Sequence, residues 1–88
     1  MPTISMFFGI LVRMYYNDTD KHKEPHIHVK YAEYEAVYAF NGEILSGKLP
    51  STQAAYVKAW TLLHADELRA NWELCVAGED AFKIEPLR

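Results

Sequence analysis

The spacing of apolar residues along this chain changes at Pro50-Ser51. Before that point, apolar and polar residues alternate over residues 26–32 and 34–40, which is typical of half-buried strands. Beyond Thr52 there is no Gly or Pro until Gly78, and apolar residues recur three and four apart, which favours helix. This order predicts an α+β fold: an antiparallel sheet of three to five strands packed against one or two C-terminal helices.

The N-terminal region is dense in β-branched and aromatic residues. We expect residues 3–16 to be extended, with a strand over 9–16 and a bulge or bend at Gly9. Residues 17–25 contain turn-forming residues and no aliphatic side chain, so they have no apolar side with which to join the core. We therefore expect an exposed loop there.

Two short links connect the alternating segments. Ala32-Glu33 is short enough for a tight hairpin, and Asn41-Gly42 accepts positive φ at both central positions of a turn. Residues 43–49 then supply a further strand, which Gly47 weakens. These features predict a meander.

The helical region contains signals for its start, its end and a break. Ser51 is a good N-cap residue, and Gly78 favours a left-handed helix stop. Asp66 is suited to start a second helix after a break near residues 64–67. Apolar and polar residues nearly alternate over residues 81–87, which predicts a short edge strand. The residues that form two apolar stripes are Tyr56, Trp60 and Leu63, and then Leu68, Trp72 and Cys75 or Val76.

Length, charge and cysteine content narrow the class of protein. The 88 residues predict one domain over 1–88, and a net charge of -3 disfavours a protein that coats nucleic acid. The single cysteine, Cys75, forbids an intrachain disulfide and fits a reducing cytoplasm. The apolar run 6–12 is too short to span a bilayer, and no basic segment precedes it, so we expect neither a membrane segment nor export.

Histidines and carboxylates are concentrated in residues 18–28, which contain Asp18, Asp20, His22, Glu24, His26 and His28. In a strand, residues two apart lie on the same face about 7 Å apart, so His26 and His28 can converge on one ion or phosphate. A zinc site needs a third ligand, for which His22, Asp18, Asp20 or the distant His64 are available. The pattern permits a divalent metal such as zinc at His22, His26 and His28.

Two other interpretations of the histidines remain open. They are ordinary solvent-facing strand residues, or one of them is an acid–base residue with a neighbouring cation to hold developing negative charge. Small endoribonucleases act this way without metal. The nearby cations are Lys21, Lys23, Lys30 and Arg13, and Arg13 either faces solvent or clamps an anion beside the histidines. Catalytic candidates are therefore His26, His28 and Arg13.

Other residues have simpler interpretations. The tyrosines at 15, 16, 31, 34 and 38 either stack bases on a sheet face or form core and dimer contacts. His64 suits the C-terminus of a helix, and Trp60 and Trp72 suit packing against the sheet. Cys75 lacks the spacing to histidine that a nucleophile needs.

Several short motifs resemble a small bacterial family, the domain of unknown function 4160 family. They include Phe8-Gly9-Ile10, Arg13-Met14-Tyr15, Pro25-His26-Ile27-His28, Gly42-Glu43-Ile44-Leu45, Asn71-Trp72 and Ile84-Glu85-Pro86-Leu87. In that family the histidine motif more often reads Pro-Pro-His-x-His. Here Glu24 replaces the first proline, and His22 matches the preceding histidine.

The resemblance implies a bacterial cytoplasmic protein without an assigned activity. Members are often encoded beside another short domain, as in toxin–antitoxin or small regulatory pairs. The leading hypothesis is therefore a partner in a two-protein regulatory module that acts by protein–protein contact, as a homodimer or with a small partner protein, for instance through a sheet edge. The alternatives are a metal-independent RNase-like toxin and a histidine/carboxylate metal-binding protein. Whether the protein is an enzyme stays open.

Overall fold

A computed structural model describes residues 3–14 and 24–87. It contains a sheet of five antiparallel strands in the sequential order β1-β2-β3-β4-β5, followed by two helices. The strands are β1 (Thr3–Phe7), β2 (Ile10–Arg13), β3 (His26–Tyr31), β4 (Tyr34–Ala39) and β5 (Ile44–Gly47), and the helices are α1 (Ser51–Leu63) and α2 (Ala65–Val76). The predicted α+β fold and the meander are confirmed.

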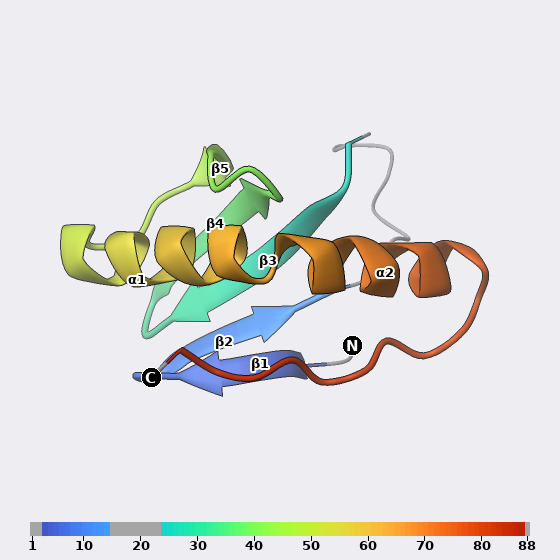
Figure 1. Ribbon diagram of the computed structural model, residues 1–88. Coiled ribbons are helices and arrows are strands. Elements are labelled where there is room, and N and C mark those ends of the chain that lie inside the picture. The colour runs from blue at the N-terminus through green and yellow to red at the C-terminus, as the bar shows by residue number, and fades with distance from the viewer. Residues whose placement is uncertain (1–2, 15–23, 88) are drawn as a thin grey trace.

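The helices lie end to end along one face of the sheet (Figure 1). The core fills the space between these two layers. Its fully buried side chains include Ile10, Val12 and Ile27 from the sheet and Val57, Trp60 and Leu68 from the helices. The side chains that alternate with the sheet residues of the core project from the opposite face, which we call the open face.

The N-terminal segment forms a hairpin where one strand with a bend at Gly9 was expected. Phe8 and Gly9 both have positive φ, 51° and 77°, and they reverse the chain between β1 and β2. Two successive left-handed residues match the right-handed twist of a two-residue hairpin, which explains why the chain turns back here. The expected strand over 9–16 is observed as β2, and the part beyond Met14 lies outside the described residues.

The other turns agree with the sequence except in one detail. Ala32, with φ of 52°, and Glu33 connect β3 to β4 tightly, as expected. At Asn41-Gly42 only Gly42 has positive φ, 87°. The amide of Gly42 bonds to the carbonyl of Ala39, and the amide of Ala39 bonds to the carbonyl of Glu43. The loop therefore has three residues and needs one left-handed position.

The expected helix break is confirmed at His64, which ends α1 and precedes α2. Ser51 is not the N-cap: Pro50 occupies that position and no side chain caps the helix. Asp66 lies in the first turn of α2 instead of capping it. Leu63 does not belong to the buried stripe, since it is 70% exposed. The ring that lies near Trp60 one turn later is His64, at i+4, with 5.4 Å between the ring centroids.

The C-terminal tail crosses back over β1 without forming the expected edge strand (Figure 1). One backbone hydrogen bond joins it to the sheet, from the amide of Ile84 to the carbonyl of Ile4. Pro86 has no amide hydrogen to continue a ladder. The tail is held instead by side chains: Trp60 Nε1 donates to the Glu85 carbonyl, and Asn71 bonds to Phe82. No helix in the described part of the chain is long and apolar enough to cross a membrane.

Candidate functional site

Arg13 and His28 lie directly opposite each other across the β2–β3 pair. The same cross-strand row continues through Val37 on β4 to Ser46 on β5. Because neighbouring strands present opposed residues on one face, this row crosses the open face. A second row places Leu11, Lys30 and Glu35 side by side. The structure therefore places Arg13 and one of the histidines opposite each other in the strand register.

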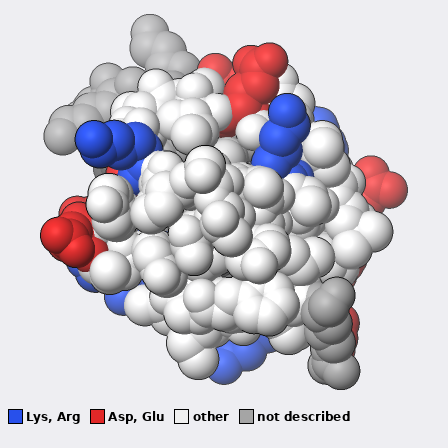
Figure 2. Space-filling model, turned by 90° about the vertical axis from the view of Figure 1, so that its left-hand side faces the viewer, with Lys and Arg blue, Asp and Glu red and all other residues white. Residues whose placement is uncertain are grey.

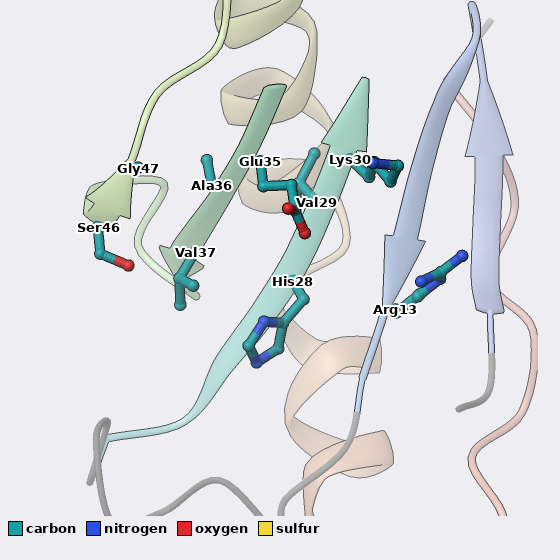
Figure 3. A pocket seen from close by; sticks show the side chains of 9 residues that line it. All are labelled: Arg13, His28, Val29, Lys30, Glu35, Ala36, Val37, Ser46 and Gly47. Atoms are coloured by element: carbon teal, nitrogen blue, oxygen red, sulfur yellow. The ribbon is translucent and has the colours of Figure 1, made fainter. Parts of the chain in front are cut away.

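A shallow pocket of about 340 Å³ lies over these two rows (Figure 3). Its lining residues are Arg13, His28, Val29, Lys30, Glu35, Ala36, Val37, Ser46 and Gly47. In Figure 3 the guanidinium of Arg13 extends toward β1 and away from the His28 ring. The pocket combines two cations, one imidazole and one carboxylate, so it suits a polar ligand better than an apolar one.

His26 is fully buried, which contradicts the interpretation of both histidines as solvent-facing residues. Its Nδ1 lies 2.8 Å from the carbonyl oxygen of Glu24, and its ring centroid lies 5.2 Å from the ring of Trp72 on α2. A carbonyl only accepts, so Nδ1 carries the proton. His26 is thus part of the packing between sheet and helix.

The two histidine rings do approach each other, with centroids 5.1 Å apart. His28 is half-buried, and it faces the open side of the sheet where a solute has access. Of the two histidines, His28 is therefore the one placed for acid–base chemistry.

The metal hypothesis is not supported by any cluster within residues 3–14 and 24–87, where no three His, Cys, Asp or Glu side chains are grouped to hold an ion. His22, Asp18 and Asp20 lie outside the described residues, as do Lys21 and Lys23. His64, the distant ligand candidate, pairs with Glu67 instead: its Nδ1 lies 2.5 Å from Oε1 of that carboxylate. A metal site at His22, His26 and His28 stays a prediction.

A second surface, which the sequence did not single out, lies at the end of the molecule where α1 begins. We call it the aromatic face; it consists of Phe8, Tyr31, Tyr34 and Tyr56. The ring of Phe8 packs on Tyr56 with a centroid distance of 4.9 Å, and Tyr31 lies opposite Tyr34 on β4. Gly9, which follows Phe8 in the chain, lies next to the ring of Tyr31: a Cβ at Gly9 would be 3.5 Å from that ring. The Phe8–Tyr56 pair and the Tyr31–Tyr34 pair are therefore neighbours.

Figure 2 shows this end of the molecule as a broad uncharged area with Lys, Arg, Asp and Glu around its rim. Phe8 is 55% exposed at this surface. The sequence signal that points to it is the Phe8-Gly9 pair between two apolar runs, a hairpin signal that was interpreted as a bend.

Of the tyrosines that were candidates for base stacking, Tyr15 and Tyr16 lie outside the described residues, and the three that are described do not form a stacking surface on the open face. Tyr38 is buried in the core, and Tyr31 and Tyr34 pack against the core from its margin. Cys75 is half-buried beside the core, and burial together with the nearby Asp80 carboxylate raises the pKa of its thiol. A raised pKa favours the protonated thiol, which is a weaker nucleophile than the thiolate.

The geometry defines a small α+β protein: a five-stranded meander with helices on one face and a polar pocket on the other. The family model described as domain of unknown function (DUF4160) matches residues 9–73, and the chain belongs to that family. The match confirms the resemblance seen in the motifs; it includes Arg13, both strand histidines and α1, and it leaves out β1 and the tail. No curated protein and no solved structure matches the chain.

Proposed function

We propose that this protein acts by binding a partner protein through the aromatic face, as one component of a two-protein regulatory or toxin–antitoxin-like module. The observation that carries the proposal is Phe8, a residue that is more than half exposed while its backbone is left-handed. Cys75 as an unpaired thiol supports a reducing cytoplasm as the site of action.

The conformation of Phe8 is unfavourable for the isolated molecule. A left-handed residue with a Cβ costs about 1–2 kcal/mol, and Asn or Gly is favoured at this position of a two-residue hairpin. Packing of the ring on Tyr56 recovers about 0.5–1.5 kcal/mol. A large exposed ring held at a strained turn is therefore better explained by contact with a partner than by folding.

The composition of the aromatic face fits a protein partner. Interface centres are enriched in aromatic residues and depleted in charge, with polar residues around the rim. The uncharged area and charged rim in Figure 2 have this arrangement. The partner expected is a small protein with an apolar surface of its own.

Phe8→Asn tests the proposal because Asn accepts the left-handed conformation, so the hairpin is kept while the ring is lost. Tagged wild-type and variant proteins are purified from host cells, and the proteins that accompany them are quantified by mass spectrometry. We expect one small protein in near-equal amount with the wild type and about tenfold less with Phe8→Asn.

Met6→Asn is the matched control, since Met6 is an exposed apolar residue of β1, 62% exposed, that is not part of the aromatic face. It is expected to retain the partner. A wild-type protein that captures nothing, or equal capture by wild type and Phe8→Asn, contradicts the proposal.

A second candidate function is supported by the opposition of Arg13 and His28. In an RNase-like reaction without metal, His28 would take the proton of the 2′-hydroxyl as the 2′-oxygen attacks phosphorus, while Arg13 stabilises the charge on the phosphate. The bond from phosphorus to the 5′-oxygen would break, the 5′-oxygen would take a proton from water, and a 2′,3′-cyclic phosphate would remain. The net charge of -3 weighs against this function. The test is cleavage of RNA in the presence of a chelator by wild type, His28→Ala and Arg13→Ala; identical behaviour of all three eliminates the candidate.

A further inference from the structure

The three tyrosines of the aromatic face, Tyr31, Tyr34 and Tyr56, combine anchored rings with free hydroxyls. All three residues are half-buried, and their rings pack against the edge of the core. Within residues 3–14 and 24–87, no group is hydrogen-bonded to any of the three hydroxyls, and these hydroxyls are not buried as that of Tyr38 is. The aromatic face therefore presents hydrogen-bond donors on a layer of apolar rings.

A surface of this kind favours a ligand that carries hydrogen-bond acceptors and apolar groups but no charge. A polyproline II segment has these properties. It has no internal hydrogen bonds, so its carbonyls are free to accept, and proline has no N–H group that needs an acceptor. Proline-rich segments are bound by aromatic-lined grooves in several classes of domain. The aromatic face has the matching character, since its charged groups stand at the rim (Figure 2).

Two other ways of binding a peptide fit this surface less well. Addition of a strand needs an unpaired sheet edge, whereas the aromatic face lies at the turns Phe8-Gly9 and Ala32-Glu33, where strands end. Docking of an amphipathic helix would press the tyrosine hydroxyls against apolar side chains. The helix offers them no acceptor, because its backbone carbonyls are already bonded within the helix.

We propose that the aromatic face binds a proline-rich segment of the partner protein in the polyproline II conformation, with the tyrosine hydroxyls donating to its carbonyls. This inference rests on the proposed function and names the part of the partner that the face contacts. The rings are held by core packing before binding, and a polyproline II segment loses little conformational freedom when it binds. The entropic cost of association is correspondingly low.

Titration with a capped decamer of proline tests the inference. Protein labelled with ¹⁵N is followed by heteronuclear NMR, and a Gly-Ser peptide of the same length is the comparison ligand. With polyproline we expect saturable shifts of the amides around Phe8, Tyr31, Tyr34 and Tyr56. With the Gly-Ser peptide we expect none, because it is flexible and has no rings to pack on the tyrosines.

The variant Tyr31→Phe/Tyr34→Phe/Tyr56→Phe keeps the three rings and removes the three hydroxyls. Its dissociation constant for polyproline is expected to rise about tenfold or more, since one lost hydrogen bond corresponds to about fivefold in affinity. Tyr38→Phe is the matched control, because that hydroxyl is buried away from the aromatic face, and it is expected to bind polyproline like the wild type. Circular dichroism checks that each variant is folded.

Three results would overturn the inference. The first is a wild type without saturable shifts at millimolar polyproline, and the second is equal binding of the Gly-Ser peptide. The third is a triple variant that binds polyproline as tightly as the wild type does.

Failure of this inference and failure of the proposed function are distinguishable in the capture experiment. A partner that is captured in a Phe8-dependent manner and stays bound at saturating polyproline removes the proline-rich segment and leaves the proposed function standing. Polyproline binding without any captured protein removes the two-protein module and leaves the peptide site.

Discussion

The side-chain amide of Asn71 makes two hydrogen bonds with the backbone of Phe82. Nδ2 donates to the Phe82 carbonyl at 2.8 Å, and Oδ1 accepts from the Phe82 amide at 2.9 Å. Asn71 is fully buried on α2, so its amide substitutes for the backbone of a neighbouring strand. This contact holds the tail where a regular ladder does not form.

Asn71→Ala is expected to lower the free energy of unfolding by about 2 kcal/mol, because both hydrogen bonds are lost at a buried site. Urea denaturation measures the change, and trypsin is expected to cleave after Lys83 faster in the variant. Glu73→Ala, an exposed substitution on the same helix, is the control and is expected to change stability by less than about 0.5 kcal/mol. Equal protease resistance of Asn71→Ala and wild type would show that the tail is held by other contacts.

The two strand histidines are expected to differ sharply in their effect on stability. His26→Ala removes a buried ring that packs on Trp72 and a hydrogen bond to Glu24, and we expect a loss of about 2–3 kcal/mol. His28→Ala changes a half-buried residue and should cost less than about 1 kcal/mol. Urea denaturation of the two variants decides this, and equal losses would contradict the assignment of His26 to the core.

Tyr38 links stability to high pH. Burial raises the pKa of its phenol, and within the described residues its hydroxyl has no hydrogen-bond partner. Above the ordinary pKa of about 10, the unfolded chain releases this proton while the folded chain retains it, so stability falls as pH rises through that range. Below that pKa, the contribution of Tyr38 to the free energy of unfolding does not change with pH.

Tyr38→Phe isolates this effect. The variant is expected to be as stable as the wild type at pH 7, or more stable by up to about 1 kcal/mol, since an unsatisfied buried hydroxyl is removed. Its stability is expected to decline less steeply above pH 10. Parallel pH profiles of the two proteins would refute this account.

Gly47 and Gly78 form a matched pair of left-handed glycines, with φ of 76° and 82°. A Cβ at Gly47 would lie 2.2 Å from the Glu35 carbonyl oxygen, whereas a Cβ at Gly78 meets nothing within 4 Å. Gly78→Ala is expected to cost about 1–2 kcal/mol for the backbone alone. Gly47→Ala adds a clash with backbone and should cost at least about 2 kcal/mol more. Similar losses for both, measured by urea denaturation, would contradict the close approach of β5 to β4.

The predictability of the fold and of the candidate site differed along the chain. The alternation in β3 and β4 and the uninterrupted helical region predicted the sheet, the meander and the helix break, because burial of one face dictates these patterns. The hairpin at Phe8-Gly9 was missed, since a glycine between apolar runs fits a bend as well as a turn. Leu63 was placed in the core wrongly, because the break at His64 directs a different residue toward the sheet at that turn.

The sequence by itself determined the class of fold and the proximity of His26 to His28, both of which follow from local periodicity. Only the tertiary structure decided that Arg13 lies opposite His28, that His26 is buried under Trp72, and that Phe8 and Tyr56 share a surface. These relationships depend on strand register and on where the helices cross the sheet. Register and crossing are set by the packing of residues far apart in the chain, which local spacing does not encode.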